Sequence, residues 1–550
     1  MITPADAPRN GSITARMSDR LRTRSALGRR WTATKDTLQR RHVPLHWTSL
    51  IGVVSMACLL MLFTTGIFLM FLYVPSSDLI TYQGAYRNLH GAEVSRAFES
   101  TMRISFEVPG GLLLRQAHHW AGLLLLASIV TQLAVTFFTG GFRRPRRLGW
   151  VLLILIFIVA LVGGWSGYAL PDDTLSGSGL RIVEGIVLGI PVVGTWLSML
   201  LFGGEFPGAI IQHLYPIHVA VVPILLIALL AARIRSSWVH KPAQFAGPGR
   251  TEENVVGAAI LPAAIARSGG LLSIVMGVLM LIAATVTVSP IWLHGPAAAG
   301  DASAGSQPDW YTGFLDGALR LVPSGWEVEW ADRTWTFAIL VPLAVVGGYF
   351  GLMLLYPFLE GWIAGDTSDH HILDRPRNVA TRTGIGVAGI VFYAVLWAAG
   401  SVDLAATQFS LSIEGLVAFL QVSLLAGPAL AFVITRRVCL ALQKKDREIA
   451  LHGFETGRIV RLPGGEYREV HEPVDQYQRW RLVSYHDQAP YDPAQEAGGH
   501  PSVLQGLRGA LSRFFFEDRI RPLTPGELGT AGSPRPSDDV GVTKERVLRS

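Results

Sequence analysis

Residues 111–138 read GLLLRQAHHWAGLLLLASIVTQLAVTFF. This run is long enough to cross the hydrocarbon core of a bilayer, which takes about 20 apolar residues. Three ionisable or potentially charged side chains lie near its start, namely Arg115, His118 and His119. Because ionisable groups inside a membrane are costly, they mark a functional site by default. The stretch therefore predicts a membrane helix that carries a buried polar site.

The whole chain shares this apolar character. Of its 550 residues, 50% are hydrophobic and 16% are charged, whereas soluble domains carry about 25% charged residues. This composition excludes a soluble multidomain protein and, for most of the length, intrinsic disorder. The only two cysteines, Cys58 and Cys439, exclude a disulfide framework and a cysteine-based zinc or iron–sulfur site. A polytopic membrane protein remains.

Apolar segments of spanning length recur along the chain, and we expect eight transmembrane helices, named A to H. They lie roughly at 46–74, 111–138, 148–169, 214–235, 270–291, 336–358, 384–402 and 412–435. The first is not a signal peptide, because it follows some 45 polar residues and lacks a small-residue cleavage site. The predicted fold class is all-α.

Lysine and arginine are distributed unevenly between the connecting segments. Forty of the 47 lie in the first 45 residues, in loops B–C, D–E and F–G, and in the tail, against six in the other loops. Basic residues favour the cytoplasmic side, so we expect a multi-pass plasma-membrane protein with both termini in the cytoplasm. The net charge of +6 then reflects topology and attraction to anionic membrane lipids, not nucleic-acid binding.

Histidines occur on two of the four N-terminal spans. Helix B carries His118 and His119, and helix D carries His213 and His218. Two histidines from different helices at similar depth suit a bis-histidine haem held inside a helix bundle. The alternative is that each histidine only packs between helices or lies at the membrane interface.

Glycines on helices A and C support the haem interpretation. Helix A has Gly52 and Gly66, and helix C ends with Gly163, Gly164 and Gly167. A flat macrocycle between helices needs positions without side chains. Close helix–helix packing is the alternative, and it is the commoner reason for small residues in membrane helices.

Five motifs carry a family resemblance. They are LRQAHHW at 114–120, GYALPDD at 167–173, FAGPGRTE at 245–252, AGSQPDWY at 304–311 and YPFLE at 356–360. Together they resemble cytochrome b of the quinol:cytochrome c reductases, most closely the actinobacterial branch. The resemblance covers roughly residues 30–470. It implies eight transmembrane helices and two b haems in the A–D bundle, one near each membrane face.

The resemblance implies a complete set of residues for the haem on the outer side. His118 and His218 match the iron ligands. Gly66 and Gly167 match the glycines beside the ring, and Arg115 matches the arginine that pairs with the haem propionates.

The same resemblance fails at the cytoplasmic side. Fourteen residues rise about 21 Å along a helix, and the second ligands should stand at that spacing. Gln132 stands there on helix B, and Ala232 or Arg233 on helix D. Leu153 replaces the expected glycine and Val135 the expected arginine, and only Gly52 survives. Arginine has no lone pair for iron, so we expect one b haem rather than two.

Loop E–F resembles the outer quinol pocket of the family. Asp309 would accept a proton from quinol, and Trp310 and Tyr311 would wall the pocket. Without the resemblance, an interfacial aromatic belt is the alternative. Asp172 and Asp173 either line the same side or form a solvated turn. The pair His370 and His371 in loop F–G looks like a metal pair, but we expect it to be solvated.

The expected function is that of a cytochrome b-like subunit of a respiratory quinol:cytochrome c oxidoreductase of the translocase class. The implied partners are quinol or quinone, a Rieske iron–sulfur protein and a c-type cytochrome subunit, in a dimeric complex. A single-haem paralogue without a complete cycle, or a scaffold for a Rieske-type partner, is the alternative. The expected parts are a basic cytoplasmic segment (1–45), the haem-binding bundle (46–240), the C-terminal helices with the quinol-site loop (241–440) and a partly disordered cytoplasmic tail (441–550).

Overall fold

The fold is all-α and membrane-spanning, as predicted. The computed structural model describes residues 26–204, 208–298, 309–323, 325–482, 490–492, 502–520 and 523. Within these ranges eight helical segments are long and apolar enough to cross a membrane. In chain order they are α3 (Trp47–Leu72), α5 (Gly111–Phe138), α6 (Arg147–Ala169), α9–η2–α10 (Ile210–Pro216, Ile217–Val221, Val222–Val239), η3–α11 (Ile260–Ala264, Ile265–Thr285), α14 (Phe337–Ala364), α15 (Ala380–Gly400) and α17 (Ile413–His452).

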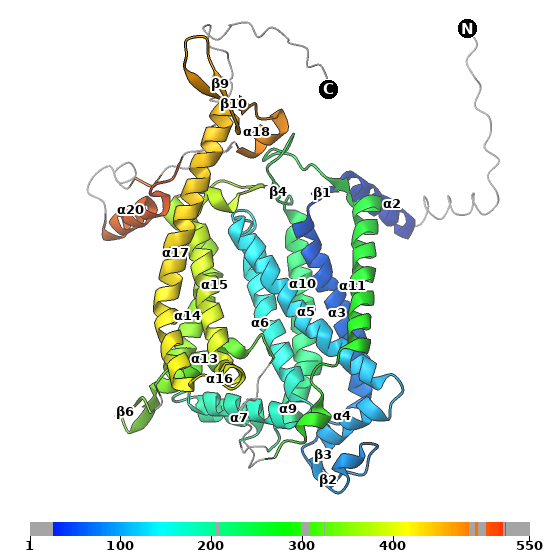
Figure 1. The fold of residues 1–550 in the computed structure, drawn as a ribbon. Helices are drawn as coiled ribbons and strands as arrows, with labels where there is room; N and C mark the ends of the chain where they lie inside the picture. Colours follow the sequence, from blue (N-terminus) through cyan, green and yellow to red (C-terminus); the bar gives the residue numbers. More distant parts are fainter. Residues whose placement is uncertain are drawn as a thin grey trace, which may run out of the picture.

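The spanning helices form two groups that lie side by side (Figure 1). In the first group α3 packs against α5, and α6 packs against both α5 and α10. In the second group α15 packs against α17 and against the short helix α13 (Gly313–Arg320), which also touches α14. Helix α11 packs on α3 and α5. The fifth span therefore belongs beside the N-terminal bundle, which refines the expected grouping of E with F, G and H.

Several helix ends differ from the expected ones, most of all the start of the fifth span and the end of the eighth. The fourth span begins at Ile210, the fifth at Ile260, and the eighth continues to His452. Hydropathy marks only the apolar part of a helix. The eighth helix runs on beyond that part through Arg436, Arg437 and further charged residues, which are good helix formers in water.

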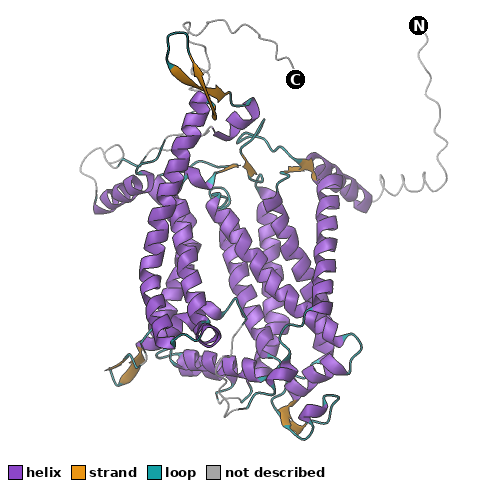
Figure 2. Cartoon of the chain, in the orientation of Figure 1, coloured by secondary structure: helices purple, strands orange, loops and turns teal. Residues whose placement is uncertain are grey.

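Short elements cover both ends of the spanning helices. The short helices are α2 (Ala26–Arg40), η1 (Arg87–Leu89), α4 (Arg96–Phe106), α7 (Thr174–Leu188), α8 (Gly194–Phe202), α12 (Ile291–His294), α13, η4 (Pro376–Asn378), α16 (Val402–Phe409), α18 (Gln476–Leu482) and α20 (Val503–Phe516). The strands pair as β1 (His42–Val43) with β5 (Ala258–Ala259), β2 (Leu79–Thr81) with β3 (Glu93–Ser95), β6 (Glu327–Trp330) with β7 (Arg333–Thr336), and β9 (Phe454–Arg461) with β10 (Tyr467–Glu472), all antiparallel. The parallel pair is β4 (Gln244–Phe245) with β8 (Ile372–Leu373). Figure 2 shows these strands only at the ends of the helices.

The N-terminal helix α2 and the C-terminal hairpin β9–β10 lie at the same end of the helices, the upper end in Figure 1. This end also carries β4, beyond the fourth span. The hairpin and α18 fall within the ordered patch expected near 450–485, and α20 was not expected. The first 25 residues, and the stretch 522–537 apart from residue 523, lie outside the described residues.

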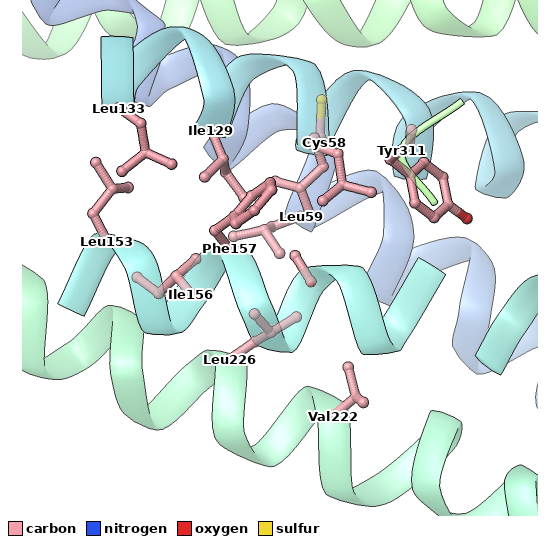
Figure 3. Packing of buried hydrophobic residues seen from close by; sticks show 14 of the residues in the cluster. Cys58, Leu59, Ile129, Leu133, Leu153, Ile156, Phe157, Val222, Leu226 and Tyr311 are labelled. Carbon is pink, nitrogen blue, oxygen red and sulfur yellow. The ribbon is translucent and has the colours of Figure 1, made fainter. Parts of the chain in front are cut away.

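The core of the first group is a cluster of apolar side chains midway along the bundle (Figure 3). Leu153 and Phe157 of α6 meet Ile129 and Leu133 of α5 there, and Leu226 comes from α10. Two cavities lie in the bundle, one toward each end. Leu59 and Leu125, at the middle of the bundle, line both of them. The two cavities are therefore separated by a thin layer of core.

Candidate functional site

The first cavity lies toward the lower end of the bundle in Figure 1 and has a volume of about 450 Å³. We call it the histidine cavity, because His118 of α5 and His218 of η2 both line it. Its walls come from α3, α5, α6 and α10, and from the segment that contains Asp309 and Tyr311. The expected haem residues and the expected quinol acid thus share one cavity.

The two imidazoles face each other across the bundle, with ring centroids 6.1 Å apart and planes at 67°. His218 Nδ1 lies 3.1 Å from the carbonyl oxygen of Gly163, so this nitrogen carries the proton. His118 Nδ1 lies 2.9 Å from Thr65 Oγ1, and that hydroxyl donates to the carbonyl of Met61. The hydroxyl must then accept from Nδ1–H of His118.

Nε2 of each ring is therefore unprotonated and has a free lone pair. Across the part of the chain that the structure describes, neither Nε2 has a hydrogen-bond partner. A histidine that binds metal typically donates its other ring N–H to a carbonyl or polar side chain, which fixes its tautomer and orientation. The pair has the arrangement that a bis-histidine iron site requires.

Two of the expected glycines are explained by the histidine rings. A Cβ atom on Gly66 would come within 3.1 Å of His118 Cε1, and one on Gly167 within 2.5 Å of His218 Cε1. Gly164 instead makes room for the Tyr311 ring, since its Cβ would lie 2.7 Å from the Tyr311 hydroxyl. A side chain at Gly66 or Gly167 would displace an imidazole.

Arg115 supplies a buried positive charge to the same cavity. Its Nη2 donates to the carbonyl oxygen of Ser289 over 3.0 Å. Its Nε is buried without a hydrogen-bond partner among the described residues. An unpaired guanidinium nitrogen in such a place suits an anionic group inside the cavity. Together with the apolar walls and the two free Nε2 atoms, it fits a b-type haem and its carboxylates.

The local sequence explains the irregular helix around His218. Residues Ile217–Val221 form one turn of π-helix between α9 and α10. Pro223 follows this turn and has no N–H to donate to the regular i−4 carbonyl. Single π-turns inside α-helices are frequent at functional sites. Two prolines, Pro216 and Pro223, therefore flank the turn that holds the imidazole.

Asp309 has two polar partners in the cavity. His119 Nε2 lies 3.1 Å from Asp309 Oδ2, and the Tyr311 hydroxyl donates to the same oxygen over 2.8 Å. Burial, together with the neighbouring carboxylate, raises the pKa of Tyr311 well above its ordinary value, so the phenol stays a donor. The sequence interpretation missed His119 as a partner of Asp309. The adjacency of two histidines at the start of helix B was the available signal.

The remaining expected residues of the outer loops have other surroundings. Trp310 packs against the bundle core, and it is Tyr311 and Asp309 that line the cavity. Asp173 is 2% exposed, caps the N-terminus of α7 and contacts His294 at 2.9 Å. The interpretation of Asp173 as part of a solvated turn is therefore wrong. Residues 304–308 of the quoted motif lie outside the described residues.

In the described part of the chain, the opposite end of the bundle has no histidine pair at the equivalent depth. There Arg233 Nη2 donates to Gln132 Oε1 over 3.3 Å, and Arg233 Nη1 donates to the carbonyl of Gly149 over 2.9 Å. Gln132 Nε2 donates in turn to Ser55 Oγ over 2.7 Å. The two residues that stand where the second ligands were expected are thus bonded to each other. Leu153 is buried beside them, and Gly52 has no atom near its would-be Cβ.

The histidines of loop F–G are not solvated as expected. His370 is 1% exposed, and its Nε2 lies 2.5 Å from Asp366 Oδ2. His371 is half-buried, and burial and the nearby Arg146 lower its pKa. The described residues contain no group of three or more potential metal ligands. The loop packs onto the spanning helices, which explains why its polar residues are buried and paired.

The fold and the cavity define a polytopic helical membrane protein built around a four-helix bundle with a buried histidine pair. Residues 123–296 match the family described as "Cytochrome b(N-terminal)/b6/petB". A "Cytochrome bc1 complex cytochrome b subunit" of Streptomyces coelicolor is 42% identical over 483 residues, 87% of this chain and 88% of the relative. The subunit of the same name from Mycobacterium leprae is 39% identical over 542 residues, 97% and 91% of the two chains.

The chain belongs to the family of cytochrome bc1 complex cytochrome b subunits. This confirms the resemblance drawn from the sequence. A solved chain described as "Hyperthermophilic respiratory Complex III" shares the fold, with a TM-score of 0.55 and 18% identity over 76% of this chain and 99% of that chain.

Proposed function

We propose that this chain is the cytochrome b subunit of a respiratory quinol:cytochrome c reductase, and that its bundle holds one b haem. Membership of the family supports the first part. Its partners are then quinol, a Rieske iron–sulfur protein and a c-type cytochrome subunit, in a dimeric complex. Both termini lie in the cytoplasm, so the histidine cavity lies toward the outer face.

One observation carries the haem assignment: two imidazoles 6.1 Å apart, each with Nδ1 bonded and Nε2 free toward a common cavity. His118 and His218 would hold the iron, Gly66 and Gly167 admit the rings, and Arg115 would pair with the carboxylates. A haem held there supplies a one-electron acceptor. The bond between Gln132 and Arg233 supports a single such site, and it favours a subunit without a complete two-haem cycle.

Quinol oxidation releases protons, and the chain offers a receiver for one of them. Asp309 faces the histidine cavity and accepts the proton from the quinol hydroxyl. Tyr311 holds the carboxylate through its own hydroxyl. His119 Nε2, at 3.1 Å, takes the proton onward from the protonated Asp309 when the ring carries its own proton on Nδ1. The acid thus has a rigid donor on one side and a proton acceptor on the other.

A haem count tests the proposal. The complex is purified from membranes, the non-covalent haem is extracted, and pyridine haemochromogen absorbance is measured per chain. We expect one b haem, and we expect His118→Ala to abolish it while His213→Ala on the fourth span leaves it. Two haems per chain would contradict the single-site assignment. No haem at all would favour the scaffold alternative, and a surviving band in His118→Ala would refute the ligand assignment.

A further inference from the structure

The second cavity of the bundle lies at the end opposite to the histidine cavity and measures about 540 Å³. We call it the arginine cavity, because Arg41 and Arg233 both line it. Ligand sites in proteins commonly measure about 300–1,000 Å³. The end of the bundle where Gln132 and Arg233 lie therefore contains a cavity of ligand size.

The walls of the arginine cavity change from apolar to polar along its length. Its inner part is formed by Leu59, Leu125 and Ile129. Toward the end of the bundle, its walls include the hydroxyl-bearing residues Thr48, Ser49 and Ser237. A ligand that fits both parts has an apolar chain and a polar head.

The charges of this cavity have one sign. Among the residues that the structure describes, Arg41 and Arg233 are the only charged ones that line it. The Arg41 guanidinium stacks over the Trp238 ring at 4.4 Å, and that of Arg233 bonds to Gln132 and Gly149. Neither has an ion-pair partner among the residues that the structure describes. A partly buried charge without a counter-charge is costly, so the cavity favours an anionic head.

The cavity also reaches the surface of the bundle. Ile234 and Trp238 of α10 line it and are 53% and 45% exposed. Because α10 is part of a spanning segment, that surface faces the bilayer. A molecule can therefore enter sideways from the membrane.

We propose that the arginine cavity binds one anionic phospholipid, with an acyl chain in its apolar inner part and its phosphate facing Arg41 and Arg233. Basic pockets between transmembrane helices on the cytoplasmic side are suited to anionic lipid head groups. A quinone has a neutral head and would leave both arginines without a counter-charge. The inference rests on the single-haem proposal, because a second haem would occupy the same end of the bundle.

Native mass spectrometry tests this proposal on the complex reconstituted in nanodiscs of phosphatidylcholine and phosphatidylglycerol. After release into detergent, we expect one phosphatidylglycerol per wild-type chain. Each arginine near an anionic membrane contributes about fivefold to binding, so Arg41→Gln/Arg233→Gln should lose the lipid. Inorganic phosphate should not displace it.

A second variant is needed, because the two arginine substitutions could lose the lipid through a folding defect. Gly52 lines the cavity, and a Cβ there meets no atom within 4 Å, so Gly52→Leu has room for its Cβ and takes up space in the cavity. It should lose the lipid and keep one haem. A Cβ on Gly277 of α11 also meets no atom within 4 Å, and Gly277 does not line the cavity. The control variant Gly277→Leu should therefore keep both the lipid and the haem.

The possible failures are distinguishable. Three outcomes would overturn the lipid inference alone. The first is retention of phosphatidylcholine or a quinone instead, and the second is displacement by phosphate. The third is one haem per chain with no retained lipid. Retention by Gly52→Leu would also overturn it. Two haems per chain would overturn both the inference and the single-haem proposal.

Discussion

The contact between Asp309 and His119 makes a proton route testable at the scale of single residues. Asp309→Asn keeps the shape of the side chain but removes the base, and a general acid–base group contributes about 10²- to 10⁴-fold. We expect quinol oxidation to fall within that range while the haem spectrum is unchanged. Asp309→Glu is the control and should retain most activity, because it keeps the carboxylate. Full activity in Asp309→Asn would exclude the carboxylate from the mechanism.

His119→Gln tests the onward step separately. Glutamine keeps a hydrogen bond to Asp309 but cannot take up a proton. We expect a lower rate of quinol oxidation with an unchanged haem spectrum. A wild-type rate in the variant would exclude His119 from the proton route.

Single residues also show which parts of the site can be predicted from the sequence. The family resemblance placed His118, His218, Gly66, Gly167 and Arg115 at one site, and the structure brings all five to one cavity. Their hydrogen-bond partners could not be predicted, since these contacts depend on how the helices rotate against one another. Thr65 and Ser166 reach the two imidazoles from different helices, and nothing in their own segments marks them.

At the scale of elements, helix α6 allows a matched pair of glycine variants. Gly167→Ala would place a methyl group 2.5 Å from the His218 ring, whereas a Cβ on Gly149 meets no atom within 4 Å. We expect the b-type absorbance per chain to fall in Gly167→Ala and to be unchanged in Gly149→Ala. Equal haem content in both variants would mean that Gly167 serves helix packing rather than the histidine site.

Element boundaries were predicted less well than element existence. Hydropathy found all eight spans, because the bilayer imposes their length and composition. It did not find the start of the fourth span or the short helices α4, α7 and α16, which lie at the bundle ends. Those helices are amphipathic or short, and their burial depends on the neighbouring chain rather than on lipid.

At the scale of the whole molecule, the orientation proposal predicts which surfaces a reagent can reach from outside the cell. The two native thiols, Cys58 and Cys439, are buried, so single cysteines can be introduced over a low background. Gln408 of α16 and Glu466 of the hairpin loop are exposed at opposite ends of the helices. A membrane-impermeant maleimide should label Gln408→Cys in intact cells, and Glu466→Cys only after permeabilisation. The reverse pattern would invert the topology.

The composition of the chain indicated a membrane protein, and the two cavities now explain what its few intramembrane polar groups do. One end of the bundle concentrates His118, His218 and Arg115 around a ligand-binding geometry. At the other end, Gln132 and Arg233 stand where the resemblance places ligands, and they are hydrogen-bonded to each other. No motif could predict that this second end keeps a cavity, since the cavity depends on the packing of four helices.

If the inner site was lost through these side chains alone, restoring them should restore a haem. The change Gln132→His/Arg233→His returns two imidazoles, Val135→Arg returns a cation, and Leu153→Gly removes a buried side chain from the ring edge. The last change costs about 3–6 kcal/mol of stability, which a bound haem offsets by mass action. Because Gly52 and a cavity of about 540 Å³ are already present, we expect the haem count to rise from one to two. The control Gln132→Ala/Arg233→Ala/Val135→Arg/Leu153→Gly should stay at one, and a count of one in the restored variant would mean that the backbone itself has closed the site to haem.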